Sequence, residues 1–404
     1  MLSIIKLSDA TPAHIQALID SEIAENLTLE YKAELPSGQS ESSREFLYDV
    51  AAMANSHGGD IVFGITDRKG ADDQSTGIAD KLSKMNMANA QTAIDRLLNL
   101  IKDGISPRLT GDLTQYVICN GSNVLVVRVP RSWNRPHMVT SSAVNKFYIR
   151  TGTQKNLMTV DEIRRSFLEQ GELSRSIRQW RLNRSDLVSS NKGPLSSIYG
   201  KTLLLFHVIP ASALTTSDIL SETWRFPEQE SRQLHVPHQI AGFRYNGDGA
   251  IGTAIAGNDT TGYTQVFRSG ISEYADCRCS HQTDHRRLVL GLEIEKEMIR
   301  CYQDAIRRLR SQVTSEPVYL GFSLLGIQNT RIYTRDEDQL FPSNDIREDT
   351  FNSPEVMVDI TESQEPPYRK VLEPLVDTMW QLTGRAGSPH RVGGVWNPLS
   401  QHFR

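Results

Sequence analysis

The stretch ENLTLEYK, which ends at Lys32, alternates apolar and polar residues and predicts a β-strand. Leu29 and Tyr31 would share one face, and Glu30 and Lys32 would share the other, because successive strand side chains point to opposite sides. Glu25 breaks this alternation, since its separation from Glu30 is odd. We therefore expect regular structure to break between Glu25 and the strand if the two glutamates are to lie close together.

Helical and strand periods alternate along roughly the first 170 residues. The apolar, β-branched run DIVFGITD predicts a buried strand that ends at Asp67. Ser42 and Glu45 form a capping box ahead of a helix that Gly58 ends, and Thr159 caps a later helix. Helices are expected over residues 42–57, 89–104 and 159–171, and strands over 29–33, 60–67, 114–119, 122–130 and 146–153.

The pattern from about residue 200 onward predicts a second unit with a strand, two hairpin-like stretches, and then long amphipathic helices between further strands. Between the two units, SRSIRQWRLNR predicts a basic helix and SSNKGPLSS a linker. The predicted fold class is thus α/β and α+β. Its parts are a mixed-sheet domain over 1–170, a basic helix and linker over 171–199, and an α+β domain over 200–404.

The composition is that of an ordinary globular protein of 404 residues, long enough for two or three domains. Four scattered cysteines form no disulfide framework and no apolar run approaches membrane-spanning length, which favours a cytoplasmic protein without membrane association. A net charge of −4 means that any nucleic-acid surface must be local. One candidate surface, which could equally be a solvated helix face, carries Arg175, Arg178, Arg181 and Arg184 at every third position.

The chain resembles the Schlafen AlbA-like domain family over roughly residues 20 to 170. The resemblance rests on the ordered motifs ENLTLEYK, FLYDVAAMANSHGGDIVFGITDRKG, ISPRL, VLVVRVPRS, RPH, FYIRTGT and TVDEIRRSF. Bacterial members of this family are often labelled DNA-binding or ATP-binding, and vertebrate Schlafens are metal-dependent endoribonucleases. Three acidic positions of that nuclease motif are matched by Glu25, Glu30 and Asp67, and its lysine by Lys32, while Thr66 replaces a frequent second aspartate.

The resemblance implies a metal-dependent endoribonuclease that cleaves structured RNA such as tRNA, in a stress or antiphage setting. Glu25, Glu30 and Asp67 would hold Mg²⁺ or Mn²⁺, and Lys32 would stabilise the transition state. A homodimer is expected, because vertebrate Schlafens contain two copies of a fold that this chain contains once. The expected nucleic-acid contacts are Arg128, Arg131, Arg135, Lys146, Arg150, Arg175, Arg178 and Arg181.

Other interpretations of the same residues stay open at the level of sequence. Glu30 and Lys32 could be a surface ion pair, and the protein could be a non-catalytic nucleic-acid-binding or regulatory module. ATP binding is a further alternative, although the glycines of ANSHGGD end a helix instead of opening one and the P-loop lysine is absent. A weak zinc-type motif consists of Cys277, Cys279, His281 and His285.

Overall fold

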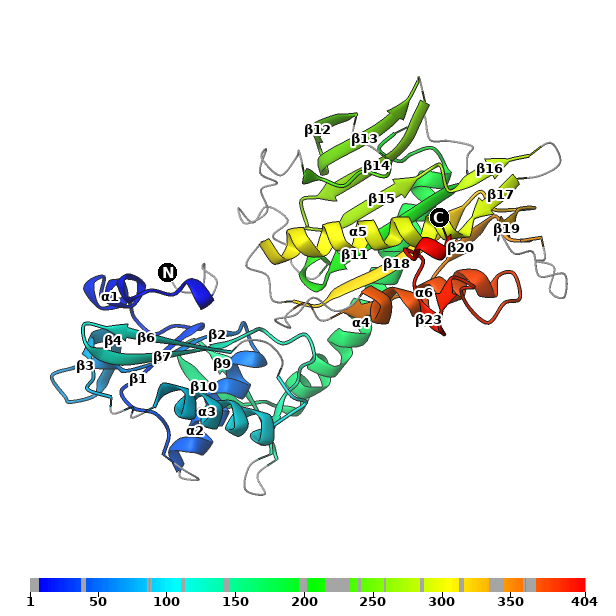
Figure 1. The fold of residues 1–404 in the computed structure, drawn as a ribbon. Helices are drawn as coiled ribbons and strands as arrows, with labels where there is room; N and C mark the ends of the chain where they lie inside the picture. Colours follow the sequence, from blue (N-terminus) through cyan, green and yellow to red (C-terminus); the bar gives the residue numbers. More distant parts are fainter. Residues whose placement is uncertain are drawn as a thin grey trace. The chain divides into compact units, whose positions relative to one another are not determined.

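The computed structural model of the chain consists of two compact units (Figure 1). Unit 1 comprises Met1–Glu172, Val313–Glu316 and Thr361–Ser363, and unit 2 comprises the remainder. Both units combine helices with sheets, which confirms the expected α/β and α+β class. The structure describes residues 7–37, 41–85, 87, 89–109, 113–140, 145–195, 202–214, 233–238, 241–257, 259–283, 287–311, 316–333, 345–358, 360 and 368–403.

The central sheet of unit 1 has the strand order β1-β2-β7-β6. β1 (Leu29–Lys32) runs parallel to β2 (Gly59–Phe63), whereas β7 (Ser122–Val129) is antiparallel to both β2 and β6 (Thr114–Cys119). Residues 120–121, an Asn-Gly pair at positive φ, form the turn between β6 and β7. The sheet is therefore mixed, as predicted.

Helices cover both faces of this sheet, and β2 contributes side chains to each face. Ile61 and Phe63 pack in a cluster with residues of α2 and α3, while Val62 packs in a second cluster with residues of α1. Burial on both sides explains why this strand is apolar without alternation. The helices are α1 (Pro12–Asp20), α2 (Glu41–Ala54) and α3 (Ala90–Gly104), and a short 3-10 helix, Leu7–Asp9, precedes them.

The single strand predicted for DIVFGITD is two strands, because the chain turns at Gly64. This glycine has a φ of 99°, and a Cβ there would lie 2.4 Å from the Asn123 carbonyl oxygen, so only glycine fits. After the turn, β3 (Ile65–Lys69) pairs with β4 (Ser75–Leu82) as a separate hairpin. The prediction that Asp67 lies at the exit of the buried strand is therefore wrong, since Asp67 lies within β3.

A second sheet of unit 1 has the order β10-β9-β8-β5, with every neighbouring pair antiparallel. It lies next to α2, and the residue that follows this helix bonds to it: the Asn55 side-chain amide donates to the Tyr148 carbonyl at 2.8 Å. The strands are β5 (Ile105–Ser106), β8 (Met138–Val139), β9 (Lys146–Thr151) and β10 (Gln154–Leu157).

A single helix, α4 (Val160–Ser189), occupies the region where two helices were predicted. It begins with the expected cap, in which Glu162 Oε2 accepts from the Thr159 backbone N–H at 2.8 Å. Glycine at position 171 does not end the helix, because Leu173 and Ile177 continue the helical period and are buried. Their burial outweighs the cost of about 1 kcal/mol for a glycine inside a helix. The boundary between the units, after residue 172, falls within α4.

Unit 2 is built on one large antiparallel sheet of order β12-β13-β14-β15-β11-β18-β20, in which β18 also pairs with β21. A smaller sheet, β16-β17-β19, and the hairpin β22-β23 accompany it. The strands are β11 (Leu203–Pro210), β12 (Gly242–Asn246), β13 (Gly249–Ala256), β14 (Asp259–Phe267), β15 (Ser272–Asp276), β16 (Ser280–Gln282), β17 (Arg287–Leu290), β18 (Val318–Leu325), β19 (Arg331–Tyr333), β20 (Thr350–Asn352), β21 (Val356–Val358), β22 (Arg391–Val392) and β23 (Val395–Trp396).

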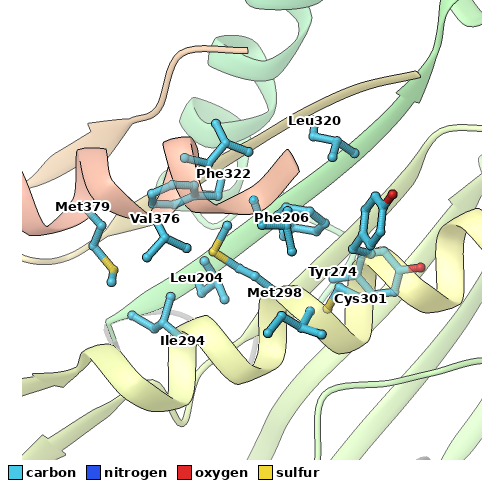
Figure 2. Close-up of a cluster of buried hydrophobic side chains, with 14 of the residues drawn as sticks. Leu204, Phe206, Tyr274, Ile294, Met298, Cys301, Leu320, Phe322, Val376 and Met379 are labelled. Atoms are coloured by element: carbon cyan, nitrogen blue, oxygen red, sulfur yellow. The ribbon is translucent and has the colours of Figure 1, made fainter. Parts of the chain in front are cut away.

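The core of unit 2 lies between this sheet and two helices, α5 (Gly291–Ser311) and α6 (Tyr368–Gln381). Figure 2 shows part of this core, in which side chains of both helices meet those of β11 and β18. Phe206 and Met298, from a strand and a helix, are both fully buried there. Two 3-10 helices, Ala211–Leu214 and Gln401–Phe403, complete the described elements.

Candidate nucleic-acid site

Glu25 lies beside β1 because the chain reverses between Asn26 and Leu29. These two residues exchange backbone hydrogen bonds of 3.1 and 3.3 Å, so the predicted break in regular structure is present. The reversal allows Glu25 Oε1 to accept a hydrogen bond from the Tyr31 N–H at 2.8 Å. Burial raises the pKa of Glu25, the bond from Tyr31 opposes this rise, and the charge of Glu30 adds to it. The two glutamates are therefore close enough to influence one another.

Both carboxylate oxygens of Glu30 are held by cations. Oε1 lies 2.7 Å from Lys32 Nζ, and Oε2 lies 2.7 Å from an Arg150 Nη. The same Arg150 nitrogen donates to the carbonyls of Asn26 and Leu29 at the chain reversal. Burial raises the pKa of Glu30, but the two ion pairs outweigh burial and lower this pKa below its ordinary value. Glu30 is therefore held as a carboxylate.

Asp49 on α2 extends this ion-pair cluster, and the sequence reasoning missed it. Its oxygens lie 3.3 Å from Lys32 Nζ and 2.9 Å from Lys155 Nζ, and Lys155 also pairs with Glu45. Burial lowers the pKa of Lys32, but Asp49 and Glu30 outweigh burial and raise it. Three carboxylates and three cations thus alternate in one cluster. No local pattern marks Asp49, because its partners come from β1 and β10.

Asp67, the third carboxylate expected at a metal, lies on the β3–β4 hairpin. Its Oδ2 is buried and has no hydrogen-bond partner among the residues that the structure describes. The donor oxygens of Glu25, Glu30 and Asp67 do not all come within 4.8 Å of one another. Carboxylates are suitable ligands for Mg²⁺ or Mn²⁺, but the Glu30 oxygens are already paired with cations. As placed, these residues do not fit one shared ion, and the metal site stays a prediction.

Two arginines expected on an exposed nucleic-acid surface are buried, and that expectation is wrong for them. Arg150 is enclosed in the ion-pair cluster around Glu30. Arg181 donates to Glu355 at 2.6 Å and to the Phe322 carbonyl at 2.7 Å, within unit 2. Placing an arginine at every third position of a helix turns some of them toward its covered face. Sequence spacing alone could not show which side of α4 packs on the sheet.

Two further expected contacts, Arg128 and Arg135, are engaged in ion pairs. The Arg128 guanidinium binds both oxygens of Asp60, at 2.7 and 3.0 Å. Arg135 pairs with Glu169 and also donates weakly to carbonyls at the end of α2. The remaining expected contacts are half-buried Arg131 and exposed Lys146, Arg175 and Arg178.

A basic and aromatic cluster lies where α2 and β7 end. Gly58, at a φ of 73°, approaches the chain after β7 so closely that a Cβ on it would lie 2.5 Å from the backbone nitrogen of Arg131. The Arg131 guanidinium lies over the Trp133 ring, 4.8 Å from its centre. Burial lowers the pKa of His57, and the charges of Arg131 and Arg135 lower it further. Arg135 also donates to the carbonyl of Ser56, the residue before His57. We call His57, Arg131, Trp133 and Arg135 the arginine–tryptophan surface.

Sequence reasoning found the arginines of this surface and missed His57 and Trp133. The signal for Trp133 is its position between two arginines in PRSWNRP. His57 gave no signal, because only the close approach at the glycine turn brings it to the end of β7. The neighbouring His137 is buried, and its Nδ1 lies 2.6 Å from the Pro107 carbonyl oxygen.

The residues of the weak zinc-type motif differ in burial. Cys277 and Cys279 are buried, and His281 is exposed. His285 lies outside the described residues. The structure therefore gives this motif no convergent set of ligands among the residues it describes.

Within the described part of the chain, no helix combines the length and the apolar character that crossing a membrane requires.

Comparison with known families identifies the mixed-sheet region of unit 1. Residues 25–159, which include the ion-pair cluster and the arginine–tryptophan surface, match the family model described as Schlafen, AlbA_2. The chain thus contains a Schlafen AlbA_2 domain, and the resemblance seen in the sequence motifs is confirmed. A search of curated proteins finds no match.

Two solved structures are similar to parts of the chain at low identity. One is the amino-terminal domain of a RecG-related protein from Nitrosomonas europaea, with 15% identity, a TM-score of 0.28, and coverage of 37% of this chain and 94% of that one. The other is the DIP2311 protein from Corynebacterium diphtheriae, with 19% identity, a TM-score of 0.24, and coverage of 36% and 26%. Similarity at this level does not bear on function.

Proposed function

We propose that unit 1 binds nucleic acid, with structured RNA such as tRNA as the favoured ligand, through the arginine–tryptophan surface. The Schlafen AlbA_2 domain supports a nucleic-acid-related function. The observation that carries the proposal is the Arg131 guanidinium stacked over Trp133 beside Arg135 and His57. Guanidinium groups attract phosphates, and aromatic rings stack on exposed bases.

This surface suits a local contact in a chain whose net charge is −4. Arg131 has no ion pair among the described residues, and its Nε is buried without a hydrogen-bond partner. Burial and the charge of Arg135 lower the pKa of Arg131, and the charges of Glu169 and Glu316 oppose this lowering. Exposed Lys146 on β9 offers a further cation in the same unit.

Replacing Arg131 with glutamine is expected to weaken RNA binding at least about tenfold and to reduce its salt dependence, because one phosphate contact is lost. Fluorescence anisotropy with labelled tRNA between low and moderate salt measures both effects. Lys102→Gln, an equal charge change at an exposed position of α3 in the same unit, is the matched control. Wild-type affinity in Arg131→Gln, with a loss in Arg178→Gln, would assign binding to α4 and contradict the proposal.

Metal-dependent endoribonuclease activity is a second candidate function of unit 1. It is favoured by the proximity of Glu25 to Glu30 and by the unpartnered oxygen of Asp67. Mg²⁺ or Mn²⁺ would supply an activated water and neutralise phosphate charge. Glu25 and Asp67 are the carboxylates available to such an ion, because Glu30 is paired with Lys32 and Arg150. Lys32 would remain positioned to stabilise developing charge.

Glu25→Gln and Asp67→Asn are each expected to lower tRNA cleavage in Mn²⁺ by about 10- to 100-fold, as loss of a metal ligand or its support typically does. Both variants leave the Glu30 ion pairs in place, and a glutamine at position 25 can still accept the Tyr31 N–H through its amide oxygen. Asp72→Asn, in the exposed turn of the same hairpin, is the control. Cleavage that persists in both variants would contradict the assignment of Glu25 and Asp67 to the site. If the wild type cleaves no RNA, the proposed endoribonuclease activity is contradicted.

Dimer formation and ATP binding are two further expectations, and both can be measured with the purified wild-type chain. A homodimer would appear as a doubled mass in light scattering. ATP binding, the weaker alternative, would raise the melting temperature on addition of nucleotide. The Gly58 N–H already donates to the Met53 carbonyl at 2.8 Å, so this amide is not available to a phosphate.

A further inference from the structure

Three side chains of different chemistry converge in unit 2, far from the Schlafen AlbA_2 domain in sequence. Glu297 and Cys301 lie one turn apart on α5, and His235 comes from the segment 233–238. One donor atom of each lies within 4.8 Å of the others. Among the residues that the structure describes, this is the group of His, Cys, Asp and Glu that could hold a metal ion.

The spacing of these donors is near that of a tetrahedral zinc site. Cys301 Sγ lies 3.7 Å from Glu297 Oε1, and His235 Nε2 lies 2.6 Å from the same oxygen. Zinc bond lengths require about 3.5 Å between sulfur and oxygen and about 3.3 Å between nitrogen and oxygen. The sulfur is therefore already in place, and the imidazole needs to withdraw by less than about 1 Å when the ion replaces the shared proton.

Neighbouring residues form hydrogen bonds that hold Glu297 and His235 in position. Arg300 donates to Glu297 Oε2 at 2.9 Å and leaves Oε1 directed at the other two donors. The Asp304 carboxylate accepts from the His235 backbone N–H at 3.2 Å, which holds the segment against α5. Figure 2 labels Cys301 within the helix–sheet core, and it is 1% exposed.

We propose that His235, Glu297 and Cys301 bind one zinc-type divalent transition-metal ion, which fastens the segment 233–238 to α5. A thiolate, a carboxylate and a neutral imidazole balance the charge of a divalent cation. The ion displaces the Cys301 thiol proton to solvent, and the neutral imidazole of His235 shifts its proton from Nε2 to Nδ1 by exchange with solvent so that Nε2 can bind the ion; no redox change is involved. Sulfur and imidazole ligands select zinc or cobalt over magnesium or calcium.

The His235 side chain is 24% exposed while that of Glu297 is 3% exposed, so solvent reaches this group from the His235 side. Burial of Cys301 rules out the alternative that it is an accessible nucleophile. This site goes beyond the function proposed for unit 1 and is independent of it.

Cobalt binding to the full-length chain tests the proposal. The metal-free protein titrated with Co²⁺ is expected to bind one equivalent and to show the near-ultraviolet absorption of a thiolate–cobalt bond, which Zn²⁺ then abolishes. Cys301→Ser should remove this absorption, and His235→Ala should weaken binding about 10- to 100-fold. Cys279→Ser is the matched control, since Cys279 is equally buried in the same core.

A second measurement separates metal binding from loss of fold. Zn²⁺ is expected to raise the melting temperature of the wild type and of Cys279→Ser, and not that of Cys301→Ser. The proposal is overturned if the wild type shows no thiolate–cobalt absorption, if Cys301→Ser retains it, or if Cys279→Ser loses it while remaining folded.

Discussion

Replacing Glu295 with leucine is expected to lower the free energy of unfolding of unit 2 by about 3–5 kcal/mol. Glu295 on α5 is fully buried, and four donors from the carboxy-terminal part of the chain point at its two oxygens. A leucine fills the volume but accepts nothing, so each buried donor loses its partner. The donors are Trp380 Nε1 at 2.6 Å, Ser388 Oγ at 2.7 Å, His390 Nδ1 at 3.0 Å and Trp396 Nε1 at 2.8 Å.

Urea unfolding followed by tryptophan fluorescence measures this change, because Trp380 and Trp396 both contact the substituted residue. Glu293→Leu is the matched control. The Glu293 side chain is 51% exposed and, among the described residues, pairs with Lys296 alone, so its loss should cost less than about 1 kcal/mol. Equal urea midpoints for the two variants would show that the buried carboxylate does not hold the end of the chain.

Replacing Arg150 with methionine is expected to destabilise unit 1 by about 3–5 kcal/mol, because it leaves Glu30 half-paired in a buried position. The carbonyls of Asn26 and Leu29 would lose a donor as well. Faster hydrogen–deuterium exchange in peptides that cover β1 and β9 reports the local opening. Arg175→Met, at an exposed site of α4, should leave this exchange unchanged.

The same ion pairs give unit 1 an acid-sensitive stability. The pKa of Glu30 is lower in the folded protein than in the unfolded chain, so its contribution is present above the ordinary glutamate pKa and is lost as the pH falls through the lowered value. Arg150→Met should show a smaller loss over this range, since only Lys32 remains as a partner. An identical pH dependence and identical exchange in this variant would contradict the role assigned to Arg150.

These ion pairs also affect how nucleic-acid experiments are interpreted. A loss of RNA binding or cleavage in Glu30→Ala or Arg150→Ala would follow from unfolding of β1 as readily as from loss of a ligand. The Asp67→Asn and Arg131→Gln variants reduce this ambiguity, because neither residue belongs to that cluster, whereas Glu25 accepts a hydrogen bond from Tyr31 of β1.

The sequence by itself determined several elements of unit 1 and the two faces of β1. Alternation in ENLTLEYK placed Glu30 and Lys32 on one side of a strand, and they form an ion pair at 2.7 Å. The misfit of Glu25 predicted the chain reversal that the structure contains. Such features depend on side chains a few residues apart, so local periodicity carries them. The ordered motifs of the first 170 residues identified the Schlafen AlbA_2 domain.

Only the tertiary structure decided which charged side chains are buried in ion pairs and which are accessible to a ligand. Asp49, Arg150 and Glu30 come from a helix and two strands, and no spacing along the chain links them. The turn at Gly64 depends on contact with a carbonyl of another strand, and it moves Asp67 out of the strand where periodicity placed it. Contacts between elements that are far apart in the sequence decide whether a residue is buried or exposed. Local sequence describes only the residue itself, so these positions required the fold.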